Sequence, residues 1–306
     1  MRVIPLPVGF TTVVSRCQQR LRRTFATNVG PNCIAPFSNP TSSKMICIRP
    51  SSSDAIPRRW TKAKRIILIR HGESCGNEDE HVYTTTPDWT IPLTEKGRAQ
   101  AATAGKQLSD LVGNEKLLVY VSPYARATET LNGILENMEG PNIVNVREDP
   151  RLAEQQFGNF QNKEEMRDAK SERNDFGRFF YRFPQGESGL DVYSRATSFF
   201  ATLRRHCKHL TENCGDEFIS DLNIVVVTHG LTLRLMLMRY FQLNVKEFED
   251  SSNPDNCQLV IMTRQVDDTT QWFELDTDSK KTLNLHNSGR GHVHWLMKTD
   301  IMSWDE

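Results

Sequence analysis

Residues 66–72 read IILIRHG and residues 223–230 read NIVVVTHG, and these two stretches decide the fold. Each begins with a continuous apolar run of strand length, which is typical of a strand buried on both faces of a sheet. Each run leads into a histidine followed by a glycine, His71 in the first stretch and His229 in the second. Because ligands bind beyond the carboxyl ends of strands in open α/β sheets, both histidines are expected at one ligand-binding edge.

Strand-like and helical patterns alternate around these two runs. Further strands are expected over 117–121, 143–146 and 257–263. Helices are expected over 94–111, 124–138, 163–180, 188–211 and 232–241. This alternation predicts an α/β fold, a three-layer αβα sandwich with a mostly parallel central sheet and helices on both faces.

Charge is distributed unevenly along the 306 residues. Residues 1–65 contain twelve Lys and Arg and a single acid, whereas residues 66–306 contain 26 bases and 37 acids, a net charge of about −11. The main body therefore lacks the clustered positive field that binding to nucleic acid or to an anionic membrane surface requires. No run of eighteen apolar residues occurs, so no transmembrane helix is expected. The seven scattered cysteines lack the paired short spacings of a zinc site, so no metal centre is predicted.

The composition predicts three regions: an N-terminal targeting segment and linker over 1–57, a folded domain over 58–266, and a polar C-terminal tail over 267–306. The first region is basic and rich in Ser and Thr, and Arg23-Thr24-Phe25-Ala26 resembles a presequence cleavage pattern. A mitochondrial location is favoured. A plastid or cytoplasmic location, a secretory signal and an unprocessed tail are the alternatives. The sequence does not predict the oligomeric state.

Four motifs follow in order along the predicted domain. Residues 70–77 read RHGESCGN, 122–130 read SPYARATET, 151–158 read RLAEQQFG and 228–230 read THG. Together they resemble the histidine phosphatase superfamily, in its phosphoglycerate mutase-like branch. The stretches YTTTPDW, IPLTEKG, FGNFQN and FYRFPQGES further resemble the plant and fungal subgroup of mutase-like proteins that includes broad-range acid phosphatases. The resemblance covers residues 65–263.

This resemblance implies that His71 is a nucleophile that forms a phosphohistidine. The role suits the residue, because a neutral imidazole is available near physiological pH and cationic neighbours lower its pKa further. Arg70 and Arg126 are expected to bind phosphate oxygens with planar guanidinium groups, and a protonated His229 would add a third positive donor. These cations are expected to take the place of a metal, and no cofactor is predicted.

The remaining site residues are also implied by the resemblance. Glu154 matches the general acid, which protonates the leaving oxygen and then activates water. The other acids considered for this role are Glu73, Glu165 and Glu187. Asn77 and Ser74 are expected to contact phosphate or substrate, and the glycine after each histidine, including Gly230, is expected to let an anion approach the backbone.

The predicted function is metal-independent hydrolysis of small phosphomonoesters, with a small phosphorylated substrate as the expected partner. A mutase is less favoured, because the insert after Glu154 carries scattered rather than paired arginines, at 167, 173, 178 and 182. A protein phosphatase and a non-catalytic binding module on the same fold are further alternatives. A bifunctional sugar kinase is disfavoured, because the chain has no GxxxxGK[ST] motif.

Three other features admit two interpretations each. Cys75 is either a redox-sensitive thiol or a packing residue. The aromatic run from Phe176 to Phe183 forms either a lid over the pocket or part of the core. The glycine-rich stretch with His292 and His294 is interpreted as tail rather than as a metal site.

Overall fold

The computed structural model describes residues 61–158, 163–266 and 271–285. The predicted targeting segment and linker, and the stretch with His292 and His294, lie outside the described residues. No helix in the described part of the chain is long and apolar enough to cross a membrane.

A six-stranded sheet in the order β3-β2-β4-β1-β5-β6 forms the centre of the fold. Its strands are β1 (Arg65–Arg70), β2 (Lys116–Val121), β3 (Asn142–Glu148), β4 (Leu222–Thr228), β5 (Leu259–Val266) and β6 (Gln271–Leu275). The first four strands pair in parallel, and β5 is antiparallel to both of its neighbours. The mostly parallel sheet is as predicted.

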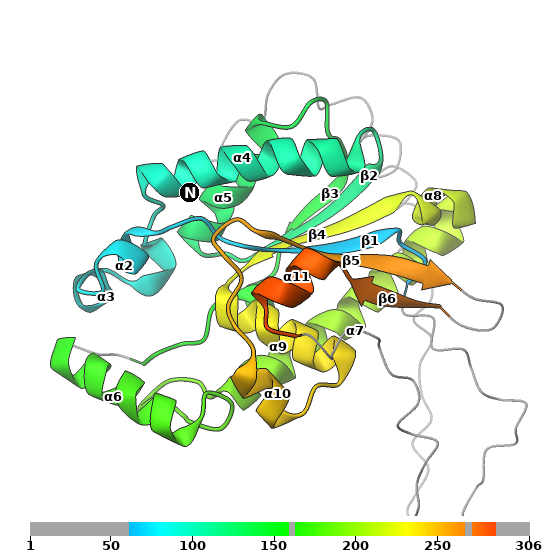
Figure 1. Ribbon diagram of the computed structural model, residues 1–306. Helices are drawn as coiled ribbons and strands as arrows, with labels where there is room; N and C mark the ends of the chain where they lie inside the picture. The colour runs from blue at the N-terminus through cyan, green and yellow to red at the C-terminus, as the bar shows by residue number, and fades with distance from the viewer. Residues whose placement is uncertain (1–60, 159–162, 267–270, 286–306) are drawn as a thin grey trace, which may run out of the picture. The chain divides into compact units, whose positions relative to one another are not determined.

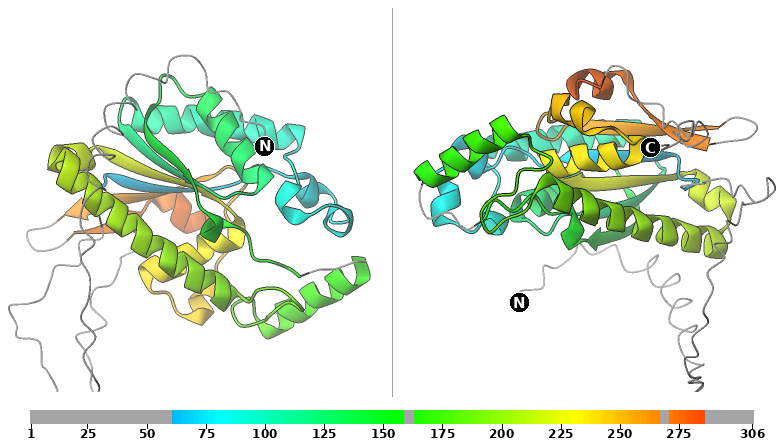
Figure 2. Two further views of the ribbon diagram at one scale, coloured as in Figure 1. Left: turned by 180° about the vertical axis from the view of Figure 1, so that it is seen from behind. Right: turned by 90° about the horizontal axis from the view of Figure 1, so that it is seen from below.

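Helices cover both faces of this sheet, with α4 and α5 on one side and α7 and α9 on the other (Figure 1). Figure 2 shows the same layers from behind and from below. The α-helices are α2 (Cys75–Glu78), α3 (Val82–Thr85), α4 (Glu95–Val112), α5 (Ala125–Glu136), α6 (Lys163–Phe176), α7 (Gly189–Cys214), α8 (Asp216–Ser220), α9 (Gly230–Phe241), α10 (Val245–Asp250) and α11 (Thr277–Thr282). Two short 3-10 helices, η1 (Asp88–Thr90) and η2 (Pro150–Leu152), complete the elements. The three-layer sandwich is therefore confirmed.

Alternation along the strands divides the core into two clusters. On β1, Ile67 and Ile69 face the cluster beneath α4 and α5, whereas Ile66 and Leu68 face the larger cluster beneath α7 and α9. All four side chains are buried. This explains the continuous apolar run, because a strand covered on both faces has no solvent side.

Most predicted boundaries differ from the structure by up to three residues, and two differ by more. The helix expected to reach residue 180 ends at Phe176, because Gly177 adopts a φ of +101° that a helix cannot continue through. The predicted polar tail contains β6 and α11, so it is wrong for residues 271–285. In β6, Phe273 and Leu275 are buried at alternate positions. The alternation covers so few residues that it does not stand out from the polar neighbours in the sequence.

The topology brings the two histidines together. Strands β1 and β4 are adjacent and parallel, and Arg70 is in register with Thr228. The backbone N–H of His71 donates to the Thr228 carbonyl at 2.9 Å. His71 and His229 therefore leave the sheet at the same edge, as the sequence predicts.

Candidate active site

The nucleophile candidate His71 is held in one ring orientation. Its Nδ1 lies 2.7 Å from the Gly72 carbonyl oxygen, and because a carbonyl can only accept, Nδ1 carries the proton. This leaves the lone pair on Nε2. The side-chain amide of Asn256 donates to the His71 carbonyl at 2.8 Å and fixes the backbone. The structure thus supplies the tautomer that a nucleophilic imidazole needs.

Burial and positive charge keep His71 neutral. Burial lowers the pKa of His71 well below its ordinary value, and the guanidinium groups of Arg126 and then Arg70 lower it further. The side chain is only 3% exposed. The imidazole is therefore unprotonated well into the acidic range, which agrees with the prediction from the neighbouring cations.

Arg126 is buried beneath its neighbours and already paired. One Nη donates to Asp88 twice, to its carboxylate at 2.7 Å and to its carbonyl at 2.8 Å. The guanidinium also lies 4.9 Å from the centre of the Tyr124 ring. Asp88, in the TTTPDW stretch, orients this arginine, a role that the sequence analysis did not assign.

The second histidine lies behind the first. The His71 and His229 rings are 5.1 Å apart, and Ser122 Oγ lies 2.8 Å from His229 Nε2. Burial, followed by the charge of Arg126, lowers the pKa of His229 well below its ordinary value. Burial and the nearby positive charges favour the neutral imidazole, so the condition under which His229 would add a third positive donor is not supported.

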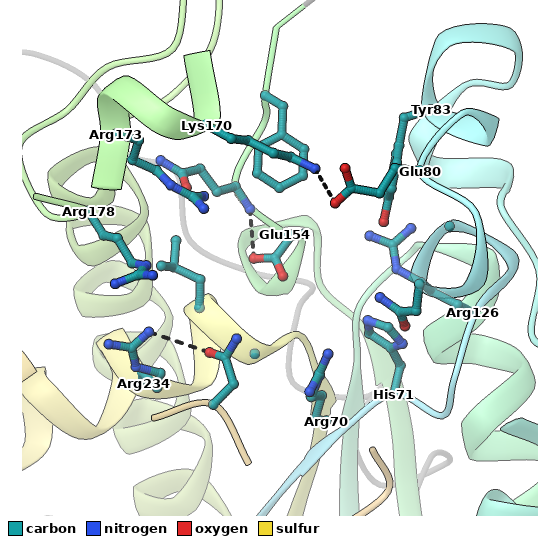
Figure 3. A pocket seen from close by; sticks show the side chains of 17 residues that line it. Arg70, His71, Glu80, Tyr83, Arg126, Glu154, Lys170, Arg173, Arg178 and Arg234 are labelled. Atoms are coloured by element: carbon teal, nitrogen blue, oxygen red, sulfur yellow. Dashed lines mark hydrogen bonds and ion pairs between the residues drawn. The ribbon is translucent and has the colours of Figure 1, made fainter. Parts of the chain in front are cut away.

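Glu154 lies between Arg178 on one side and His71 on the other (Figure 3). Its Oε1 accepts from the Gln155 N–H at 2.9 Å and from the Thr232 hydroxyl at 3.4 Å. Burial raises the pKa of Glu154 above the ordinary 4.5. A carboxyl group that keeps its proton to higher pH suits a general acid.

Arg195, on α7, holds the loop that carries Glu154. Its guanidinium donates to the carbonyl oxygens of Arg151, Ala153 and Glu154 at 2.6, 2.8 and 3.0 Å, and pairs with the Glu187 carboxylate at 3.1 Å. These contacts hold the backbone of residues 151–154, and they thereby set the position of the Glu154 carboxyl group. Arg195 is therefore a positioning residue.

We expect Arg195→Ala to lower both stability and kcat. The change leaves three carbonyls and one carboxylate without their shared donor, which costs about 2 kcal/mol or more in the free energy of unfolding. Denaturant unfolding and kcat for an alkyl phosphate measure the two effects. Arg205→Ala is the matched control, because Arg205 is an exposed arginine on the same helix. Equal kcat values in the two variants would show that Arg195 does not position Glu154.

A cavity of about 280 Å³ joins most of these residues. Its lining includes six of the predicted site residues, namely Arg70, His71, Asn77, Arg126, Glu154 and Gly230. Arg70 is fixed by donating to the Pro254 carbonyl at 2.9 Å. His229 does not line the cavity, and its ring lies 5.1 Å from that of His71.

Ser74 does not reach the cavity. It is fully buried, and its hydroxyl donates to the Asn77 side chain at 3.1 Å within the cap of α2. The expected contact of Ser74 with phosphate is therefore not supported. The need for glycine at position 72 also has a different cause from the one expected. A Cβ there would lie 2.6 Å from the Gly97 carbonyl oxygen, so this glycine permits close packing of α4 rather than the approach of an anion.

The alternative acids are engaged elsewhere or lie outside the cavity. Glu73 pairs with Lys96 at 2.7 Å, Glu187 pairs with Arg195, and Glu165 is exposed. None of the three lines the cavity. Glu80 does, but it pairs with Lys170 at 2.8 Å. Glu154 is therefore the best-placed proton donor.

The structure also bears on the aromatic run and on Cys75, which the sequence left with two interpretations each. Phe179 and Phe183 are buried, Phe176 and Phe180 are exposed, and none of the aromatic side chains of the run lines the cavity, so the lid interpretation is not supported. Cys75 packs with its sulfur 4.0 Å from the Leu93 carbonyl oxygen. Among the described residues, no group of three or more His, Cys, Asp and Glu is arranged to hold a metal ion.

Two of the four insert arginines converge in space. Arg173 and Arg178 line the cavity together with Arg234 from α9. Arg167 is 77% exposed, and Arg182 pairs with Asp191 at 2.7 Å. The sequence analysis missed this convergence, because Arg234 is 56 residues beyond Arg178 along the chain.

Comparison with known proteins agrees with this geometry. Residues 66–273 match the histidine phosphatase superfamily (branch 1). The phosphoglycerate mutase-like protein AT74H of Arabidopsis thaliana is 42% identical over 248 residues, covering 78% of this chain and 84% of its own. The broad-range acid phosphatase DET1 of Saccharomyces cerevisiae is 29% identical over 305 residues, covering 71% and 89%.

Solved structures share the fold. A mycobacterial glucosyl-3-phosphoglycerate phosphatase in complex with inorganic phosphate superposes with a TM-score of 0.53 at 24% identity, over 70% of this chain and 96% of its own. The motifs, the sheet and the clustered histidines and arginines all agree with the family match. The chain belongs to the histidine phosphatase superfamily.

Proposed function

We propose that the protein is a metal-independent phosphatase that hydrolyses small phosphomonoesters through a phosphohistidine at His71. One observation carries the proposal: a neutral imidazole with its lone pair on Nε2 and a carboxyl with a raised pKa line the same arginine-rich cavity. The names of the related proteins, which include a broad-range acid phosphatase, support hydrolysis.

The first half-reaction transfers the phosphoryl group to the protein. The Nε2 lone pair of His71 attacks phosphorus while the bond between phosphorus and the ester oxygen breaks. Glu154 gives its proton to the departing oxygen, so the product leaves as an alcohol. Arg70 and Arg126 neutralise charge on the phosphoryl oxygens, which is the main demand of phosphoryl transfer.

The second half-reaction returns the site to its starting state. The ionised Glu154 takes a proton from a water molecule whose oxygen attacks the phosphorus. The bond between phosphorus and Nε2 breaks, inorganic phosphate leaves, and His71 is again neutral. One carboxyl group therefore serves as acid and then as base.

Transfer to a second hydroxyl is the alternative function. The convergence of Arg173, Arg178 and Arg234 favours it more than the sequence did, because additional cations retain a doubly charged intermediate. A mutase would interconvert phosphorylated isomers with little release of phosphate. Measuring phosphate and isomer in the same reaction separates the two functions.

We expect a chelator to leave the rate of phosphate release unchanged. The reason is that guanidinium groups, rather than a metal ion, face the phosphoryl oxygens in this account. The measurement is phosphate release from a panel of phosphomonoesters between pH 5 and 8, with and without EDTA. Activity that collapses with EDTA and returns with an added divalent metal would contradict the proposal.

A further inference from the structure

A second cationic cluster lies across the cavity from His71. It consists of Arg173 on α6, Arg178 in the turn after α6, and Arg234 on α9. Figure 3 shows these three side chains on one wall, with Arg70, His71 and Arg126 on the opposite wall and Glu154 between them. We call Arg173, Arg178 and Arg234 the distal cluster.

The distal cluster has no carboxylate partner. Among the described residues, none of its three members takes part in an ion pair within 4 Å, whereas Lys170 nearby is paired with Glu80. Neutral groups hold the arginines instead. Arg234 donates to the Ser251 hydroxyl at 2.9 Å and to the Phe248 carbonyl at 2.6 Å, and Arg178 donates to the Asn174 side chain at 3.2 Å.

Arg173 leaves a donor unused. Among the described residues, its buried Nε has no hydrogen-bond partner, and its guanidinium lies 5.4 Å from the centre of the Phe183 ring. A buried polar atom without a partner is costly, so such atoms in a cavity wall point to a ligand that supplies the missing acceptor. Arg70 and Arg126 on the opposite wall have the same feature at Nε.

The three cations repel one another. Burial lowers the pKa of Arg234 to about 10, and the charges of Arg178 and Arg173 contribute to the shift. The pKa of Arg173 is also lowered, first by burial and then by Arg178. The carboxylates of Glu249 and Glu154 oppose both shifts only in part. A cluster held together against this repulsion binds an anion favourably, because the anion removes both the desolvation cost and the repulsion.

We propose that the distal cluster binds a second phosphate group carried by the same substrate, so that the preferred substrates are small bisphosphorylated molecules. This inference rests on the proposed function, since it assumes that the first phosphate is the one attacked by His71. Three guanidinium groups match the double charge and three free oxygens of a phosphate monoester better than the single charge of a carboxylate.

The cavity also offers apolar contact to a short carbon spacer. Leu231 and Phe157 line it together with the cationic side chains. The volume of about 280 Å³ is enough for a small molecule. A substrate that bridges both walls gains from the two sites together, as a bivalent ligand does.

The test compares matched ligands on the full chain. The probes are straight-chain diol bisphosphates of two to six carbons, alkyl monophosphates of the same lengths, and phosphorylated hydroxyalkanoates. Affinity is measured by calorimetry on the His71→Ala protein, in which the proposed nucleophile is absent, and kcat/KM is measured on the wild type. We expect at least one bisphosphate to bind about tenfold tighter than its monophosphate, with an optimum in chain length.

Variants assign the preference to the distal cluster. Arg178→Gln and Arg173→Gln, each also combined with His71→Ala, are expected to reduce the bisphosphate preference about tenfold, whereas Arg167→Gln, an exposed arginine on α6, leaves it unchanged. Arg234→Lys, which keeps the charge but loses the planar geometry, gives a second estimate if a glutamine variant does not fold.

Each outcome decides the proposal. Equal affinity for bisphosphates and monophosphates at every length, a preference for the carboxylates, or a preference that survives in the distal variants would overturn it. Monophosphate turnover without a bisphosphate preference would remove the distal site and leave the proposed function intact. Absence of all turnover would remove the proposed function, and the binding series would still decide the distal site.

Discussion

His71→Ala is expected to lower kcat/KM for every phosphomonoester on the order of 10⁴-fold or more, while the protein stays folded. In the proposed mechanism the imidazole supplies the atom to which phosphorus becomes bonded, and among the described residues no other histidine, cysteine or serine lines the cavity. The His229 ring lies 5.1 Å from that of His71, but His229 does not line the cavity and its Nε2 is engaged with Ser122. The measurement is phosphate release under saturating and subsaturating substrate.

Trapping of the intermediate provides the decisive readout. Rapid quenching of wild-type protein with a radiolabelled phosphomonoester should give an acid-labile, base-stable phosphoprotein, and His71→Ala should give none. His209→Ala is the matched control, because His209 is exposed on α7 and remote in sequence from every motif. Near wild-type hydrolysis by the His71→Ala protein would refute the phosphohistidine mechanism.

The sheet was predictable because its central strands have a distinctive apolar sequence pattern. Burial on both faces favours apolar residues at every central position of β1 and β4, and a continuous run such as IVVV has few other uses in a polar chain. Strand β6 lacked this signal, because it pairs only with β5 and buries only Phe273 and Leu275 well. Edge strands follow tertiary context more than local pattern.

The core of the site was predictable for a different reason. The resemblance to the histidine phosphatase superfamily implied these residues, since His71, Arg126, Glu154 and His229 each lie in a short motif that matches the family's pattern. Ser122 lies in one of these motifs, so its contact with His229 was within reach of the same reasoning. Arg195 and the distal cluster lie far along the chain from the residues that they approach in the fold. A single arginine in a charged helix has no local sequence pattern that would reveal such a contact.

Glu154→Gln is expected to slow hydrolysis in proportion to the basicity of the leaving group. An alkyl phosphate releases a strongly basic oxygen that needs a proton, so its phosphorylation step should slow by about 10²- to 10⁴-fold. A p-nitrophenyl phosphate releases a stable phenolate, so this step should be nearly unaffected. With the latter substrate the phosphoprotein should accumulate, because the base that activates water is also gone.

The pH dependence of kcat/KM tests the same residue independently, since it reports groups in the free protein. The lowered pKa of His71 keeps the nucleophile unprotonated well below pH 6.5, so activity is retained on the acidic side. Glu154 acts as an acid only while protonated, so activity toward an alkyl phosphate should fall as the pH rises through its raised pKa. That fall should vanish in Glu154→Gln, and any basic limb that remains belongs to ionisation of the substrate phosphate. An equal rate loss for alkyl and nitrophenyl esters, with the basic limb unchanged, would assign the proton transfer to another group. Tyr83, which lines the same cavity, would be the next residue to test.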